Sequence, residues 1–334
     1  MDGPLLRVRG LTVRFDTPRG PVRVPQDLDL DVPAGTTVAL VGESGSGKSV
    51  TALALLRLLR NPPATIEAGS ALFEGKDLLR LGERELRAVR GARLSLVFQE
   101  PMTALNPVHP VGAQIAEVLR LHGTGRREAQ DRAVELLGEV GIPDPRARAR
   151  AYPHELSGGM RQRALIAMAV ACKPALVIAD EPTTALDVSV QAQILDLFER
   201  LRSTSGSSFL FITHDLGVVA EQAKEVVVMY AAQVVESGPV ADVFRTPLHP
   251  YTRGLLESLP RLGASRDPSR PRRLAAIEGV VTDLARPPAG CRFAERCALV
   301  RARAPGTSRC ATEPPPLREI TPGRRARCHL AEAP

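Results

Sequence analysis

The chain has 334 residues, of which 44% are hydrophobic, so it can bury a large core and does not have the composition of a disordered protein. A membrane-spanning helix needs about 18 apolar residues in a row, and no apolar run of the chain approaches this length. The first residues, MDGPLLRVRG, lack the features of a secretory signal. We therefore expect a cytosolic protein. The net charge of +7 is concentrated in residues 261–334, which hold 15 arginines and 7 acidic residues. This basic tail indicates either an anionic partner or a solvated segment.

The first hundred residues alternate between strand-like and helix-like patterns around a glycine-rich loop. Apolar or alternating runs predict strands at residues 5–15, 36–41 and 94–98. The loop GESGSGKS follows the second of these strands. After it, the amphipathic segment 50–60 predicts a helix that ends where Asn61 is followed by two prolines. A strand, a glycine loop and a helix in this order are what a phosphate site needs.

Residues from about 100 to 165 interrupt this alternation with helical periodicity, so we interpret them as an inserted helical subdomain. The strand–helix pattern then resumes with buried strands at 175–179 and 208–213 and a helix at 188–203. Beyond about residue 250, proline and arginine increase and the periodicity fades. We therefore predict an α/β domain over residues 1–250 and a small appended domain over residues 251–334.

The segment GESGSGKS matches the phosphate-binding pattern G-x-x-x-x-G-K-[ST]. Its glycines let successive backbone N–H groups converge on phosphates, and the following helix N-terminus adds a positive end. Lys48 is expected to reach the β- and γ-phosphates of ATP, and the Ser49 hydroxyl is expected to bind Mg²⁺. A chance match on a glycine-rich turn is the alternative, which the flanking strand and helix weaken. The other loop residues assigned to ATP are Gly42, Ser44, Gly45 and Gly47.

The segment ALVIADEP supplies two carboxylates directly after a buried strand. A strand that ends in Asp180 places its carboxylate beside the Mg²⁺ of a nucleotide. Glu181 then becomes the candidate general base that polarises the attacking water. The alternative is a pair of surface acids, but five apolar residues lead directly into them.

A third motif, LSGGMRQR, lies ahead of this strand, and together the three motifs resemble those of the ATP-binding-cassette (ABC) ATPases. Ser157, Gly158 and Gly159 are expected to open a helix over about 158–171, which makes a second anion-binding N-terminus. The resemblance implies an α/β P-loop NTPase fold with a mixed sheet core, the helical subdomain and a small cysteine-containing extension. It also implies that this signature faces the γ-phosphate held by a second subunit, so that ATP is sandwiched in a dimer.

Other residues resemble further family elements in the expected order. Gln99, at the end of LSLVFQ, resembles the glutamine that senses Mg²⁺ and water. Asp187, in TALD, resembles the aspartate at the dimer seam. His214, which closes a strand, resembles the switch histidine that contacts the γ-phosphate, although a lone histidine is more often structural. Phe15 resembles the aromatic residue that stacks on adenine, although a phenylalanine that ends a strand is commonly a core residue.

Four longer stretches resemble the oligopeptide and dipeptide importer branch of the family, which also includes nickel importers. These stretches are VGESGSGKSVTALALLRLL, FQEPMTALNPV, HPYTRGLLESLP and GCRFAERC. The branch implies an ATPase that drives peptide import from the cytoplasmic face of the membrane. It further implies a second, often paralogous ATPase subunit, two permease subunits and an extracytoplasmic solute-binding protein. An ATPase of a nickel or other small-solute importer is the alternative.

Two other functions are alternatives to transport. A soluble ABC ATPase that acts on nucleic acid would usually carry two cassettes or long coiled coils, whereas this chain has one cassette and no sustained heptads. The absence of tryptophan and an aromatic content of 3% also argue against base-stacking platforms, so we expect no nucleic-acid partner. A non-catalytic cassette would be expected to lack Glu181 or His214, and both are present.

Four of the five cysteines lie in the last 44 residues, at Cys291, Cys297, Cys310 and Cys328. A bound metal could stabilise this tail, which has few apolar residues. A cytosolic setting disfavours disulfides, and zinc sites usually show tighter cysteine pairs. The loose spacing suits a [4Fe–4S] cluster, and the resemblance points the same way because some peptide-importer ATPases carry one there. Zinc and free thiols are the alternatives.

Overall fold

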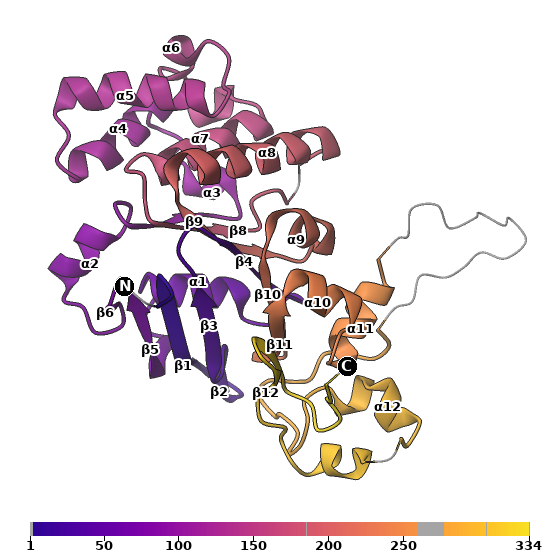
Figure 1. The fold of residues 1–334 in the computed structure, drawn as a ribbon. Coiled ribbons are helices and arrows are strands. Elements are labelled where there is room, and N and C mark those ends of the chain that lie inside the picture. Colours follow the sequence, from indigo (N-terminus) through magenta and orange to yellow (C-terminus); the bar gives the residue numbers. More distant parts are fainter. Residues whose placement is uncertain (1–2, 185, 260–276, 305, 334) are drawn as a thin grey trace, which may run out of the picture.

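The computed structural model describes residues 3–184, 186–259, 277–304 and 306–333, and it contains two β-sheets with helices around them (Figure 1). The smaller sheet is antiparallel, with strand order β2-β1-β5-β6 and with β3 paired to β1. Its members are β1 (Leu6–Thr17), β2 (Gly20–Arg23), β3 (Leu28–Val32), β5 (Ala64–Phe73) and β6 (Lys76–Asp77). Of these, the sequence analysis predicted only β1. The apolar alternation of LDLDV is the signal by which β3 could have been found.

The larger sheet has eight strands in the order β12-β13-β11-β10-β4-β9-β8-β7. Its half from β10 to β7 is parallel, and the strands from β11 to β12 run antiparallel to their neighbours. The parallel strands are continuous apolar runs because both of their faces are covered. The bounds are β4 (Thr37–Gly42), β7 (Leu94–Val97), β8 (Leu176–Asp180), β9 (Ser208–Thr213), β10 (Glu225–Tyr230), β11 (Gln233–Pro239), β12 (Arg318–Thr321) and β13 (Arg324–Ala326).

Helix α1 (Lys48–Leu55) follows the glycine loop, and its apolar side joins the core between the two sheets. The sequence analysis extended this helix to residue 60, which was wrong. Arg57 has a φ of 49°, and the N–H of Leu58 donates to the carbonyl of Leu53 at 2.8 Å. These features form a Schellman motif, which satisfies the last carbonyls and ends the helix one turn early.

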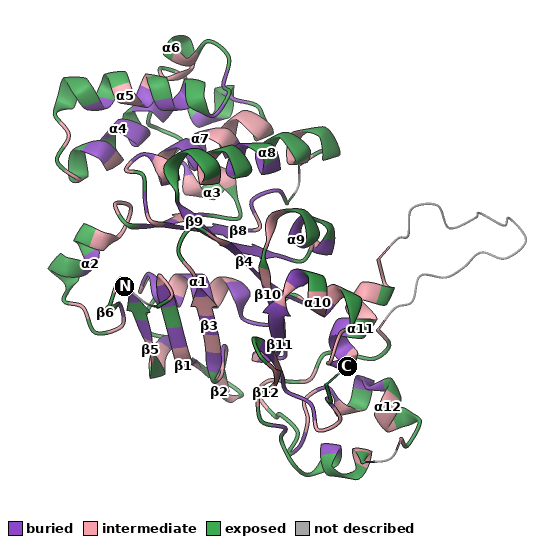
Figure 2. Ribbon diagram, viewed as in Figure 1, coloured by how far each residue is buried: buried purple, intermediate pink, exposed green. Residues whose placement is uncertain are grey.

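A group of helices covers the other face of the parallel strands (Figure 1). Most of them lie in or near residues 100–165, where the periodicity predicted helices. The outer side of α5 is exposed and its inner side is buried (Figure 2). The members are α3 (Pro101–Ala104), α4 (Val111–Leu121), α5 (Arg126–Glu139), α6 (Pro145–Arg148), α7 (Gly158–Val170) and α8 (Val188–Ser205). The remaining α-helices of the described residues are α2 (Glu83–Val89), α9 (Leu216–Gln222), α10 (Val240–Arg245), α11 (Pro250–Glu257) and α12 (Ala298–Arg301). None of the described helices has the length and apolar character needed to cross a membrane.

The C-terminal region extends the larger sheet, because the hairpin of β12 and β13 pairs with β11. Arg324 in β13 forms an ion pair with Glu236 in β11 at 3.3 Å, and both side chains are at most 5% exposed. Other arginines of this region also meet partners in the first 250 residues. These contacts join Arg292 to Gln26, Arg296 to Glu43, Arg325 to Asp29 and Arg327 to Asp27. Part of the basic charge of the C-terminal region is therefore paired with acidic groups of the same chain.

Candidate active site

The glycine loop lies between β4 and α1 and is pressed closely against neighbouring chain segments. Gly42 has a φ of 154°, and a Cβ added there would lie 2.2 Å from the carbonyl oxygen of Met229. Gly47 has a φ of 101°, and its Cβ would lie 2.8 Å from a methyl group of Val24. No other residue fits these two positions without displacing the backbone of the loop or its neighbours.

Lys48 is buried at the base of the loop, where its Nζ donates hydrogen bonds to the carbonyl oxygens of Gly42 at 2.8 Å and Glu43 at 3.2 Å. Burial lowers the pKa of Lys48, and the nearby charges of Glu181, Asp180 and Glu43 act in the opposite direction. Within the part of the chain that the structure describes, the ammonium group bonds to carbonyl oxygens and to no carboxylate. A phosphate oxygen would supply the negative charge that this desolvated cation lacks.

Ser49 and Asp180 form the pair expected to hold Mg²⁺. The Ser49 hydroxyl donates to Oδ1 of Asp180 at 3.0 Å, and Asp180 is only 8% exposed at the end of β8. Burial raises the pKa of Asp180; the hydrogen bond from Ser49 opposes this shift, and the charge of Glu181 adds to it. A hydroxyl and a buried carboxylate in contact fit Mg²⁺, which prefers oxygen ligands and would offset the cost of the buried charge.

Glu181 lies next to the two other predicted catalytic residues, Gln99 and His214. Its Oε2 accepts hydrogen bonds from Nε2 of Gln99 at 3.1 Å and from Oγ1 of Thr184 at 2.9 Å, and its Oε1 lies 3.5 Å from Nδ1 of His214. Glu181 has a φ of 45°, a strained backbone conformation for a residue other than glycine. The sequence analysis missed Thr184, although the motif places it one turn after Glu181. This arrangement can orient a carboxylate as a general base.

A cavity of about 470 Å³ connects the loop with Gln99 and Glu181. Phe15, at the end of β1, lines this cavity and also packs against the core between the sheets, so both interpretations made from the sequence are compatible with its position. Val22 in β2 and Val24 just after β2 also line the cavity. The sequence analysis did not identify these two residues. The cavity is therefore bounded by the smaller sheet on one side and by the phosphate loop on the other.

The signature residues are not among those that line this cavity. Ser157 and Gly158 are exposed at the start of α7, where Oγ of Ser157 accepts a hydrogen bond from the N–H of Met160 at 3.3 Å. Asp187 is also exposed and caps α8 by accepting from the N–H of Val190 at 2.9 Å. The capped N-termini of α7 and α8 are therefore exposed, and their residues do not line the cavity beside the loop of the same chain.

The four C-terminal cysteines carry free thiols and line one small cavity of about 10 Å³. Burial raises the pKa of Cys291 to about 11 and also raises the pKa values of Cys310 and Cys328, and the neighbouring thiols add to each shift. The fold thus brings together four residues that are spread over 38 positions in the sequence. Within the described ranges, however, no three or more His, Cys, Asp or Glu side chains are grouped closely enough to hold a metal ion.

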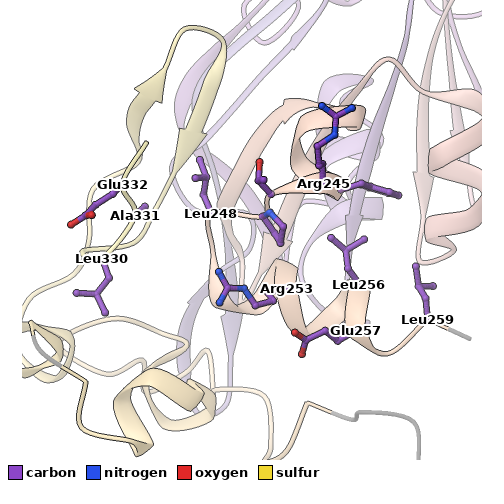
Figure 3. A pocket seen from close by; sticks show the side chains of 12 residues that line it. Arg245, Leu248, Arg253, Leu256, Glu257, Leu259, Leu330, Ala331 and Glu332 are labelled. Carbon is purple, nitrogen blue, oxygen red and sulfur yellow. The ribbon is translucent and has the colours of Figure 1, made fainter. Parts of the chain in front are cut away.

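A larger cavity, of about 860 Å³, lies away from the loop, between α11 and the C-terminal residues (Figure 3). Arg253 and Leu256 line one side, and Leu330 and Glu332 line the other. It contains none of the predicted nucleotide residues. Its size alone does not make it the active site, because the titratable groups suited to phosphate chemistry converge on the smaller cavity.

Comparisons with known proteins agree with this geometry. The family model described as "ABC transporter" matches residues 25–184, and the model described as "Oligopeptide/dipeptide transporter, C-terminal region" matches residues 235–303. A putative peptide import ATP-binding protein of Brucella melitensis is 54% identical over 97% of this chain and 96% of its own length. The dipeptide transport ATP-binding protein DppD of Escherichia coli is 45% identical over the same shares of the two chains.

Solved structures share the fold. A dimeric bacterial ABC transporter cassette superposes with a TM-score of 0.63 at 24% identity, over 70% of this chain and 98% of that one. The protein cbiO1 from Clostridium perfringens, part of the ABC transporter complex cbiONQ, gives a TM-score of 0.61 over 73% of this chain and 92% of its own, also at 24% identity. The relatives of 45% identity and above cover nearly the whole chain, and so this protein belongs to the family of ABC transporter ATP-binding subunits, the ATPases of these transporters.

Proposed function

We propose that the chain is the ATP-hydrolysing subunit of a membrane importer for oligopeptides or dipeptides. The convergence of Gln99, Glu181 and His214 beside the phosphate loop carries the proposal for ATP hydrolysis. The peptide substrate is supported by the names of the relatives and by the match to the C-terminal region of oligopeptide and dipeptide transporters. Import of nickel or another small solute remains the alternative from the sequence.

Each residue of the site has a distinct role in this proposal. The loop N–H groups and Lys48 bind the phosphates, and Ser49 and Asp180 hold Mg²⁺, which when bound neutralises charge on the phosphate oxygens. Glu181 takes the proton from the attacking water, and Gln99 and Thr184 hold its carboxylate in place. His214 lies beside the same carboxylate, and its role in this proposal is to contact the γ-phosphate.

The complex that this function requires has more members than the chain itself. We propose a second ATPase subunit, two permease subunits and an extracytoplasmic solute-binding protein, with this chain bound peripherally at the cytoplasmic face. The division at residue 250 between a catalytic domain and a C-terminal extension is part of the same proposal.

Uptake of labelled dipeptides and longer peptides by cells without this gene tests the proposed import function. Restoration by the wild-type gene and not by Lys48→Ala is expected; normal peptide uptake with impaired nickel uptake would favour the alternative.

The permease contact is expected between Gln99 and about Val118. Met102 and Val108 in this segment are 61% and 71% exposed, so cysteines at these positions would be accessible to a partner. Leu105, in the same segment, is only 1% exposed and is therefore unsuitable as a cross-linking position. Cysteines at Met102 and Val108 should form adducts with a permease in the assembled complex. A cysteine at Leu121, which is 76% exposed at the end of α4, is the matched control and should not. Equal labelling at the three positions would contradict the placement.

The four thiols are the proposed ligands of a [4Fe–4S] cluster. Four cysteines around one cavity are the right donor set, with one thiolate for each iron. Because the described thiols are not grouped as a metal site in this structure, they would have to rearrange on loading. Anaerobically purified protein should be brown and contain about four irons and four sulfides per chain. Cys297→Ser should lose the colour, and Cys172→Ser, outside this cavity, should keep it. Colourless protein with stoichiometric zinc, or four freely titratable thiols, would contradict the proposal.

A further inference from the structure

Arg296 connects the C-terminal region to the phosphate loop. Its guanidinium group forms a two-pronged ion pair with Glu43, the second residue of the loop, with Nη1 2.8 Å from Oε2 and Nη2 3.1 Å from Oε1. The two residues are 253 positions apart in the chain. The Arg296 side chain is 6% exposed and that of Glu43 is 27% exposed. The pair is thus largely shielded from water, where such contacts are stronger than at the surface.

Every N–H of this guanidinium group has a partner. Besides the two bonds to Glu43, Nη1 donates to the Tyr230 hydroxyl at 3.4 Å, Nη2 donates to the carbonyl of Ile277 at 3.1 Å, and Nε donates to the carbonyl of Glu278 at 3.2 Å. Arginine has five such donors in a rigid plane, and lysine cannot reproduce this set. The orientation of Arg296, and with it the direction in which Glu43 is held, is therefore fixed.

The backbone of Glu43 is held from the same side and in turn holds the loop. Its N–H donates to the hydroxyl of Tyr251, a fully buried residue of α11, at 3.1 Å. Its carbonyl oxygen accepts from Nζ of Lys48 at 3.2 Å and from the N–H of Ser46 at 3.2 Å. A displacement of Glu43 would thus move the acceptor that positions Lys48 and would disturb the turn of the loop.

Arg296 is also anchored to the wall of the thiol cavity. Phe293, which lines that cavity, packs against Tyr230 at a ring-centroid distance of 5.1 Å and against Tyr251 at 5.5 Å. Arg296 lies over the ring of Tyr230 at 5.5 Å and directly precedes Cys297. The groups that hold Glu43 therefore belong to the same packed unit as the four thiols.

We propose that Arg296 is a positioning residue for ATP binding: through Glu43 it fixes the phosphate loop in the form that receives the nucleotide. The inference rests on the proposed function, because it requires that this loop binds ATP. A loop ordered before binding does not lose that conformational freedom when ATP arrives, so affinity is higher. The C-terminal region then contributes to the active site of the same chain through Glu43.

The test compares ATP affinity among variants of the full-length chain, measured by titration of a fluorescent non-hydrolysable ATP analogue with Mg²⁺. Arg296→Lys keeps the positive charge and loses the fork, so its Kd should rise about tenfold, the loss expected for one charge-assisted hydrogen bond. Arg301→Ala is the matched control. It removes the exposed pair of Arg301 and Glu278, 2.6 Å apart in the same region, and should leave the Kd unchanged.

A second variant separates positioning from general stability. Glu43→Gln changes the pair from the loop side, and it should also raise the Kd about tenfold. The substitutions act on one contact, so Arg296→Lys added to Glu43→Gln should raise the Kd by less than a further twofold or so. Loss of folded protein lowers the number of binding sites in the titration but not the affinity of those that remain.

Folded Arg296→Lys and Glu43→Gln chains with the wild-type Kd would overturn the proposal. Failure of the wild-type chain to bind, or unchanged binding by Lys48→Ala, would instead refute the proposed function.

Discussion

Replacement of Glu181 by glutamine is expected to slow ATP hydrolysis by about 10² to 10⁴, the usual loss when a general base is removed. The amide keeps the shape of the carboxylate. Its oxygen can still accept the hydrogen bonds from Gln99 and Thr184, and its NH₂ group can face Nδ1 of His214. Glu181→Gln should therefore bind ATP normally and accumulate as a closed, nucleotide-loaded dimer.

Single-turnover release of phosphate by the assembled complex measures this loss directly, and size-exclusion chromatography with light scattering reports the dimer. Glu221→Gln is a suitable control, because Glu221 is an exposed carboxylate on α9 outside the cavity. It should hydrolyse ATP at the wild-type rate. Near-normal hydrolysis by the Glu181→Gln complex would show that another group is the base.

The second large effect is expected at a site that Ser157 shares with the partner subunit. Ser157 and Gly158 are exposed and do not line the cavity of their own chain, so their anion-binding helix N-terminus is available to another loop. Ser157→Arg should therefore inactivate the site built on the partner's phosphate loop, with a loss of about 10² to 10³ in hydrolysis there, as for removal of a donor to a developing charge. ATP binding to Lys48 of the same chain should persist.

An experiment with a wild-type partner subunit distinguishes a signature that acts across the dimer from one that acts within its own chain. The partner can be a second copy or a paralogue. Lys48→Ala in this chain inactivates its own loop and leaves the activity of the partner's loop. If the signature acts across the dimer, addition of Ser157→Arg should abolish that remaining activity. If it acts within its own chain, the double variant should hydrolyse ATP as fast as Lys48→Ala alone. Full activity from a verified monomer would also refute the shared site.

The local motifs of this protein were readable from its sequence because their chemistry depends on neighbouring residues. A glycine loop between a strand and a helix, and two acids after an apolar strand, are complete within about ten residues, and the structure has both. The parallel strands were found because full burial produces continuous apolar runs. The helix after the loop was overextended, because Arg57 occupies a left-handed position that more often belongs to glycine.

Contacts between distant segments were decided only by the tertiary structure. Thr184 shares the Glu181 carboxylate with Gln99, which lies 82 positions from Glu181. The strand β13 shows no apolar alternation, because two of its three residues are arginines that form ion pairs with acids of the first 250 residues. Arg296 was, in the sequence, one of 15 arginines in a basic tail. Periodicity and spacing describe how each segment buries its own side chains, whereas the pairing of Arg296 with Glu43 depends on how the whole chain returns to the phosphate loop.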